Sequence, residues 1–195
     1  MTKYFAAALI AASALAGPAM AQRAPAAVVV VVDTDRIGQE CTACRSATTQ
    51  IQQRQQQLRT RAQTLQTQLQ TEGKPIQDAF EALKGRQPDA ALQARITAFQ
   101  AKEQQARQEL ANSERTLQST QAHVNQQIAT RARTIIGTIA AQRGANLAVS
   151  KEATIYSAQA VDITDAVLAQ LNQQLPAVSV TPLPQQPQQT NPQGR

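Results

Sequence analysis

The chain has 195 residues, a length that allows one domain with an elongated extension but excludes a large multidomain enzyme. Only 3% of the residues are aromatic and Trp is absent, so few large side chains are available for a broad globular core. Lys and Arg outnumber Asp and Glu by 19 to 13, and the resulting formal net charge of +6 predicts an acidic partner. Much of the 42% hydrophobic content is Ala, a strong helix former that buries little surface. The composition therefore favours a long, thin, helical molecule.

Residues 1–21 have the features of a secretory signal peptide. Lys3 precedes an apolar run over residues 4–17, and small residues lead up to a cleavage position after Ala21. The apolar run is shorter than the ~20 residues needed to span a bilayer, which argues against a membrane anchor. We therefore expect export and cleavage after Ala21, and no partnership with cytosolic nucleic acid.

The first element expected after the signal peptide is a buried strand. Residues 26–33 form a largely β-branched run that is too short for an ordinary helix and too apolar for an exposed one. Thr34 or Asp35 can cap a short helical turn behind it.

Two long helices, residues 46–83 and 89–143, are predicted from apolar side chains that recur with the spacing of a coiled coil. Residues 84–88 resemble a turn, and Asp89 can cap the second helix, so the pair should form an antiparallel hairpin. Gly73 and Pro75 predict a kink or a local loosening in the first helix. The expected seam consists of Ile51, Leu58, Ala62, Leu65, Leu69, Ile76 and Leu83 on the first helix and of Leu92, Ile96, Phe99, Ala106, Leu110, Leu117, Val124, Ile128, Ile135 and Ile139 on the second.

The segment after the hairpin is expected to return to the first strand. Gly144 can end the second helix, and residues 146–150 and 153–158 each have the pattern of a short strand, so they predict a β-hairpin. Thr164 is a suitable N-cap for a helix over residues 165–174. From residue 176 onward the chain is rich in Pro and Gln without apolar periodicity, which predicts a disordered tail.

This order of elements resembles the Skp (OmpH-like) family of periplasmic chaperones. The resemblance is carried by Asn146-Leu-Ala-Val-Ser150, by Ala153-Thr-Ile-Tyr156, by the D-I-T-x-x-V-L segment that begins at Asp162, and by V-V-D-x-x-R at residues 31–36. It spans residues 26–175, although the helical arm matches only in composition and periodicity. It implies an ATP-independent holdase of the periplasm, and no nucleotide-binding loop is present in the sequence.

The resemblance also implies a mostly α, α+β fold with a trimeric, jellyfish-like architecture. Residues 22–45 and 144–175 would form a discontinuous β-body shared between three subunits, residues 46–143 a helical hairpin arm, and residues 176–195 the tail. The residues expected to build the trimer body are Val29, Val30, Val31, Leu147, Val149, Ile155, Tyr156, Val167, Leu168 and Leu171.

The arm is expected to bind unfolded outer-membrane proteins. Between residues 46 and 143 there are thirteen basic and seven acidic side chains, so the arm carries the positive charge of the protein. A basic cage would attract acidic clients in a salt-dependent way. The alternative for each cation is that it only keeps the helix surface hydrated. The alternative for each apolar residue is that it packs within the hairpin. The candidate client-binding residues are Arg59, Arg61, Lys74, Ile76, Phe80, Leu83, Lys84, Arg86, Leu92, Arg95, Ile96, Phe99, Lys102 and Arg107.

The motif Cys41-Thr-Ala-Cys44 admits three interpretations. It can form a local disulfide at the junction of body and arm, remain as free thiols, or carry redox or metal chemistry. A thioredoxin-like surround is absent from the sequence, and one such motif with one His does not complete a four-ligand zinc site within a subunit.

The sequence therefore predicts a non-enzymatic holdase without catalytic, cofactor-binding or metal-binding residues. Its partners would be unfolded outer-membrane proteins and two further copies of itself. The positive charge is also compatible with contact to anionic lipid or lipopolysaccharide. The alternatives are a structural coiled-coil adaptor of the cell envelope with fixed partners and, less well supported, a thiol oxidoreductase.

Overall fold

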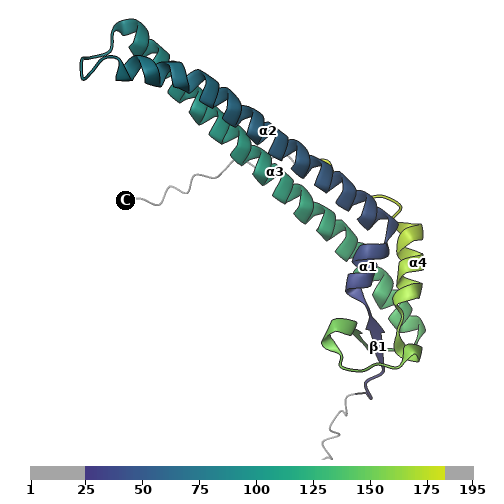
Figure 1. Ribbon diagram of the computed structural model, residues 1–195. Coiled ribbons are helices and arrows are strands. Elements are labelled where there is room, and N and C mark those ends of the chain that lie inside the picture. Colours follow the sequence, from purple (N-terminus) through teal and green to yellow (C-terminus); the bar gives the residue numbers. More distant parts are fainter. Residues whose placement is uncertain (1–24, 183–195) are drawn as a thin grey trace, which may run out of the picture.

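The computed structural model describes residues 25–182, in which a long helical hairpin stands on a small body (Figure 1). The predicted signal peptide lies outside the described residues, as do residues 183–195 of the tail. The elements are, in order, β1 (Val29–Val32), α1 (Thr34–Glu40), α2 (Thr42–Glu81), α3 (Ala90–Gln142), β2 (Leu147–Ser150), the 3-10 turns η1 (Lys151–Ala153) and η2 (Gln159–Val161), and α4 (Thr164–Gln174). The mostly helical character and the small sheet expected from the sequence are confirmed.

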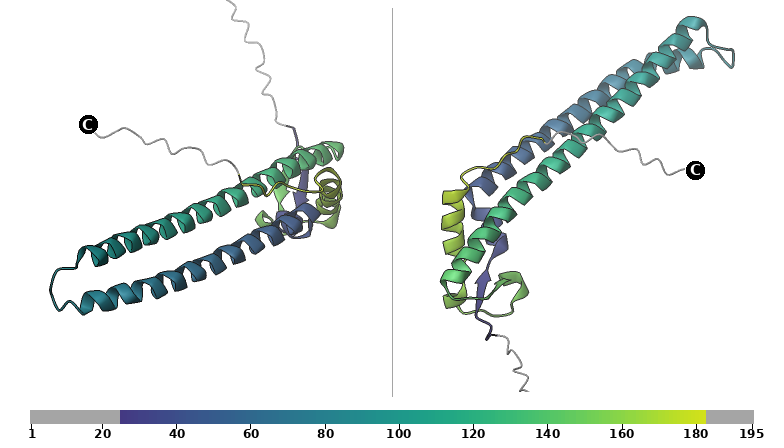
Figure 2. Two further views of the ribbon diagram at one scale, coloured as in Figure 1. Left: turned by 90° about the horizontal axis from the view of Figure 1, so that it is seen from above. Right: turned by 180° about the vertical axis from the view of Figure 1, so that it is seen from behind.

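The arm consists of α2 and α3, which lie side by side in opposite directions (Figure 2). With 40 and 53 residues they are roughly 60 and 80 Å long at ~1.5 Å per residue. The predicted seam lies between them, because its members are buried or half-buried along both helices. The arm therefore extends far beyond the body on a thin apolar contact.

The expected weak point in α2 does not interrupt the helix, which is continuous through Gly73 and Pro75. Proline lacks the N–H that would bond to the carbonyl of Thr71, so one ladder hydrogen bond is missing. Glu72, which the heptad pattern places on the seam, is exposed instead, and its carboxylate pairs with Lys102 of α3.

Three predicted helix starts need correction, those of α1, α2 and α4, whereas the start of α3 is as predicted. Asp33, and neither Thr34 nor Asp35, caps α1, since its Oδ1 accepts a hydrogen bond from the Arg36 N–H at 2.8 Å. Helix α2 begins at Thr42 and not at residue 46, with Cys41 as its N-cap. Asp89 caps α3 as predicted, because its Oδ1 accepts from the Leu92 N–H at 2.7 Å.

The third correction concerns α4, where Thr164 is the first helical residue and not the N-cap. Its hydroxyl accepts a hydrogen bond from the Asp33 N–H at 2.9 Å, which joins α4 to the end of β1. The N-cap is Ile163, which makes no side-chain capping bond, and the Thr164 N–H donates instead to Oδ1 of Asp162 at 2.9 Å.

Strands β1 and β2 are parallel, with Val29 opposite Leu147 and Val32 opposite Ser150. The whole arm forms the connection between them, and Val31 of β1 also makes an isolated parallel bridge with Asp162. The predicted hairpin is wrong, because residues 153–158 form no strand. The chain turns at η1 immediately after β2, where the Thr154 N–H bonds to the Lys151 carbonyl at 3.0 Å, so it does not return to pair with β2.

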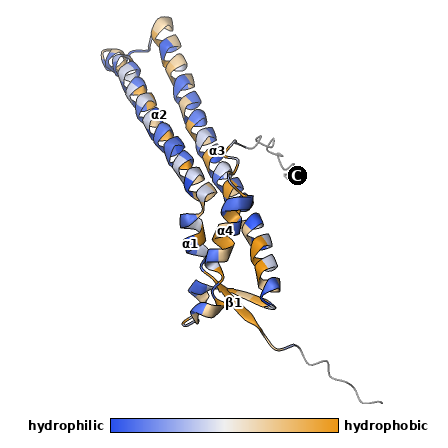
Figure 3. Cartoon of the chain, turned by 90° about the vertical axis from the view of Figure 1, so that its right-hand side faces the viewer, coloured by the Kyte–Doolittle hydropathy of each residue, from blue (hydrophilic) through white to orange (hydrophobic). Residues whose placement is uncertain are grey.

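The core lies in the body, between β1, α1, the lower ends of α2 and α3, and α4. Figure 3 shows the same distribution, with apolar residues gathered in the body and polar residues prevailing along the arm. The most deeply buried apolar side chains there are Val32, Cys41, Ala43, Ile135, Ile163, Val167 and Leu171.

The beginning of the predicted disordered tail is ordered in the structure. Residues 176–182, here called the C-terminal strap, contain no helix or strand but run from α4 onto α3 (Figure 2). Val178 packs against the body core, and the backbone of Ser179 bonds to the side chain of Gln127. Composition therefore misassigned the first part of this segment.

Candidate functional site

An open groove of about 690 Å³ lies on the arm near its tip. Four of the predicted apolar client-binding residues line it, from both helices: Ile76, Phe80, Ile96 and Phe99. Phe80 is 56% exposed, an unusual state for so large an apolar side chain. Of the remaining two, Leu83 is half-buried beyond the groove, and Leu92 is buried within the hairpin.

The groove owes its floor to Gly73. A Cβ at this position would lie 2.9 Å from Cζ of Phe99, so the ring rests directly against the backbone of α2. Any larger residue would push the ring outward. The signal for this contact was present in the sequence as a lone Gly in a helical pattern, where it predicted only a weak point.

The predicted cations divide into two groups. Arg61, Lys74 and Lys102 form ion pairs with carboxylates, whereas the other five have no ion-pair partner among residues 25–182. These five are exposed along the arm and around its tip: Arg59, Lys84, Arg86, Arg95 and Arg107. They are the cations free to meet an acidic partner, whereas the charged residues that line the tip groove itself are Lys74, its ion-pair partner Asp78, and Glu81.

Two ion pairs cross the arm and were not foreseen from the sequence. Arg61 of α2 binds Glu109 of α3 through both carboxylate oxygens, and Lys102 of α3 binds Glu72 of α2. The hydrogen bond from Arg61 lowers the pKa of Glu109 and raises that of the guanidinium. Since the side chains of both pairs are substantially exposed, each pair contributes little to stability.

The predicted trimer-body residues separate into a buried and an exposed set. Val30, Val31, Val167, Leu168 and Leu171 are buried within the single chain, and Val29 and Val149 are half-buried.

The exposed set includes Leu147 of β2 and two residues that follow this strand in the sequence. Leu147 is 47% exposed, whereas Ile155 and Tyr156 are almost fully exposed. Val28, next to β1, is also exposed. These four side chains are therefore the large apolar residues that the body leaves exposed in the described chain.

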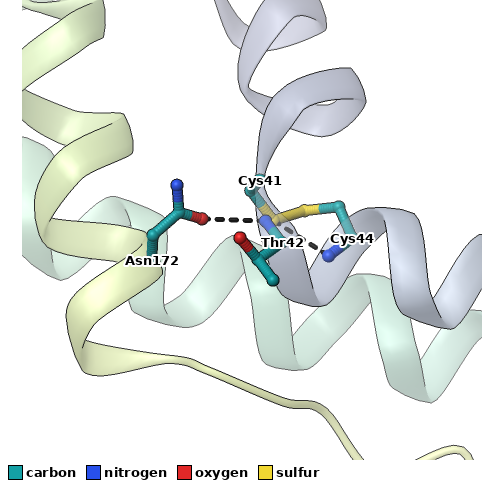
Figure 4. Close-up of a disulfide and its surroundings, with 4 residues drawn as sticks. All are labelled: Cys41, Thr42, Cys44 and Asn172. Atoms are coloured by element: carbon teal, nitrogen blue, oxygen red, sulfur yellow. Dashed lines mark hydrogen bonds between the residues drawn. A yellow bond between two sulfur atoms is a disulfide. The ribbon is translucent and has the colours of Figure 1, made fainter.

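A disulfide joins Cys41 and Cys44 at the junction between α1 and α2 (Figure 4). Both cysteines are buried, at 0% and 4% exposure, and Cys41 Sγ accepts a hydrogen bond from the Cys44 N–H. The adjacent Thr42 N–H donates to Oδ1 of Asn172 in α4 at 2.8 Å. The first turn of α2 is therefore held both by the disulfide and by the body.

A cluster of charged residues joins α1, η1 and the start of α4. Arg36 pairs with Asp165, and Lys151 lies near the carboxylates of Asp33 and Asp162. Burial raises the pKa of Asp162, but hydrogen bonds from Thr164 and the charge of Lys151 outweigh it, and the net pKa is lowered. These contacts join the ends of the folded chain and leave little free charge.

Within residues 25–182, no group of three or more His, Cys, Asp or Glu side chains is arranged to hold a metal ion. None of the described helices combines the length and the apolar character needed to cross a membrane.

Comparison with known proteins identifies the relatives of this fold. A search of curated proteins finds no match. Among solved structures, the chain is similar to a protein from Caulobacter crescentus, provisionally assigned as an outer membrane chaperone (OmpH-like), with a TM-score of 0.65 and 19% sequence identity. The match covers 78% of this chain and 88% of that one, and it shows a shared fold. The family model described as outer membrane protein (OmpH-like) matches residues 28–171, so the chain belongs to the OmpH-like family.

Proposed function

We propose that this protein is an ATP-independent holdase of the periplasm, which binds unfolded outer-membrane proteins between the arms of a homotrimer and prevents their aggregation before insertion. Family membership and the chaperone assignment of the Caulobacter protein support the general role. The observation that carries the proposal is the tip groove, which exposed Phe80 lines together with Ile76, Ile96 and Phe99, on an arm that also carries five exposed cations without an ion-pair partner among residues 25–182.

Such a surface suits a chaperone better than an enzyme. The groove is open, so it offers apolar contact without selecting one shape. The exposed cations Arg59, Arg95 and Arg107 would add a long-range attraction to acidic chains, which salt screens. Weak contacts of both kinds let a client leave without nucleotide hydrolysis.

Self-association is supported by the exposed edge of the body. The outer edge of β2 pairs with no strand in the described chain, and open edges readily pair with another chain. Leu147, Ile155 and Tyr156 place exposed apolar side chains on and just beyond this strand. Burying them between three copies would complete a core that one chain leaves open.

The test separates arm from body. Replacing residues 70–100 by a short Gly-Asn loop should leave a trimer by sedimentation equilibrium but abolish protection of an unfolded barrel protein in a light-scattering assay. Protection by the intact chain should weaken as salt rises from 50 to 500 mM. A monomeric intact chain, or one that leaves denatured barrels to aggregate at low salt, would overturn the proposal, and the adaptor alternative would then gain support.

A point substitution refines the assignment to the groove. Phe80→Ser should weaken client affinity about three- to tenfold, because it removes much of one partly exposed aromatic contact. It should leave the unfolding curve nearly unchanged, since the ring is already exposed. Ala129→Ser, at an exposed position of α3 near the body, is the matched control and should change neither. Equal client affinity in both variants would remove the groove from the mechanism.

A further inference from the structure

The C-terminal strap is bound to α3 partly through hydrogen bonds to its backbone. The side-chain amide of Gln127 donates from Nε2 to the carbonyl of Ser179 at 2.9 Å, and its Oε1 accepts from the Ser179 N–H at 3.0 Å. In an antiparallel sheet, a residue makes the same two hydrogen bonds to the residue opposite it, one from its N–H and one to its carbonyl. Gln127 therefore replaces one peptide unit of a neighbouring strand.

The glutamine is held in place for this contact by its own helix. Its Nε2 also donates to the His123 carbonyl at 3.3 Å, one turn earlier on α3. This bond directs the carboxamide across the helix surface, where it meets the strap. A side chain with both a donor and an acceptor in one plane is required, and Gln supplies it.

The strap presents alternating side chains to the protein. Val178 and Val180 are half-buried, whereas Ser179 and Thr181 are exposed. Val178 packs against the body core. The strap therefore lies on α3 as a short extended segment with its apolar residues inward and its polar residues outward.

This apolar–polar alternation is also the sequence pattern of strands in outer-membrane barrels, which alternate between lipid-facing apolar and lumen-facing polar residues. We propose that Gln127 and the adjoining surface of α3 form a binding site for extended polypeptide of alternating polarity, and that the strap occupies this site in the free protein as an internal competitor of the client. The inference rests on the proposed function, since it assigns one contact of a barrel-protein holdase to these residues. It adds a site near the body to the groove at the arm tip.

Occupation by the strap should reduce the apparent affinity for a client segment. If the strap is bound in about nine molecules of ten, its release raises that affinity about tenfold. The competition also provides a simple route to release, because the strap returns to the site when the client leaves.

The experiment uses fluorescence anisotropy with a labelled peptide of sequence VSVTVSVT and a control peptide of the same composition in the order VVVVSTST. The double substitution Val178→Ser with Val180→Ser in the full-length chain should tighten binding of the alternating peptide about tenfold. Adding Gln127→Ala should reverse this gain, whereas Gln126→Ala, at an exposed neighbouring position, should not. Unchanged affinity in the double variant, no loss with Gln127→Ala, or equal binding of both peptides would overturn the inference.

A second measurement uses the unmodified protein. Hydrogen exchange of the Ser179 amide should accelerate when the alternating peptide is bound, because the peptide displaces the strap from Gln127. Exchange that stays the same at saturating peptide would also overturn the inference. Protection of unfolded barrels by the intact chain, measured in parallel, separates the two proposals: if protection is present while these results fail, only the strap site is lost.

Discussion

The hydrogen bond between Thr164 and Asp33 offers a sharp test of how the two ends of the chain are joined. The Thr164 side chain is 1% exposed, and its hydroxyl accepts from a backbone N–H that lies 131 residues earlier. Thr164→Val keeps the shape of the side chain but removes the acceptor. The Asp33 N–H then has no protein partner, at a cost of ~1–3 kcal/mol.

The matched control is Thr164→Ser, which keeps the hydroxyl and removes one buried methyl group, at a cost of ~1 kcal/mol. Both variants should be compared by urea unfolding at one protomer concentration, because association would add its own stability. The expected losses in unfolding free energy of the two variants differ only modestly, so hydrogen exchange of the Asp33 amide is the measurement that distinguishes them. Its hydrogen exchange should accelerate in Thr164→Val and stay slow in Thr164→Ser. Retained protection in the Val variant, together with unchanged stability, would refute the role assigned to this bond.

Two further predictions concern the disulfide between Cys41 and Cys44 and the ion pair between Arg61 and Glu109. Replacing both Cys41 and Cys44 by Ala should destabilise the chain by only ~2 kcal/mol, because the disulfide closes a very short loop. Client protection by this variant should be nearly unchanged, and its complete loss would favour the oxidoreductase interpretation. For Glu109, the pKa is lowered from its usual 4.5 in the folded chain, so the contribution of its pair with Arg61 is present above that value and disappears as the pH falls through the folded pKa. The unfolding midpoints of the wild type and of Glu109→Gln should therefore differ slightly at pH 7 and converge once the pH falls below the lowered pKa of Glu109 in the folded chain, whereas a difference that widens in acid would contradict this assignment.

Most of the helical hairpin could be predicted because its signal is repeated many times. Apolar side chains recur on one seam along most of α2 and α3, so single exceptions such as Glu72 do not alter the result. The cap at Asp89 was predictable for the same reason that it functions, since a carboxylate there can accept from the first free N–H groups.

The helix starts and the second predicted strand failed because they depend on more distant contacts. Cys41 is not a preferred N-cap residue, and its sulfur serves at the start of α2 because it is held near the Cys44 N–H. Ile155 and Tyr156 have strong strand propensity, but within one chain no neighbouring strand is available to them.

The candidate site was predictable in its residue types but not in its arrangement. Ile76, Phe80, Ile96 and Phe99 were assigned to the tip from their position in the hairpin, and they do line one groove. The ion pairs across the arm require the exact rotation of each helix, which periodicity determines only roughly. Gln127 could not be singled out, because this chain has many glutamines and only its contact with Ser179 sets it apart.

The parallel pairing of β1 with β2 has a consequence for the order in which the molecule is assembled. The first strand leaves the ribosome long before its partner, since Val28 and Asn146, which bond beside the pair, are 118 residues apart. Until then a run of consecutive valines has no neighbour, which is a hazard for a nascent polypeptide. Pairing of α2 with α3 brings the two strands close together. It should come before the sheet, because local helical contacts form faster than remote ones. Biogenesis should therefore proceed from the distal hairpin toward the base, with the sheet closing last.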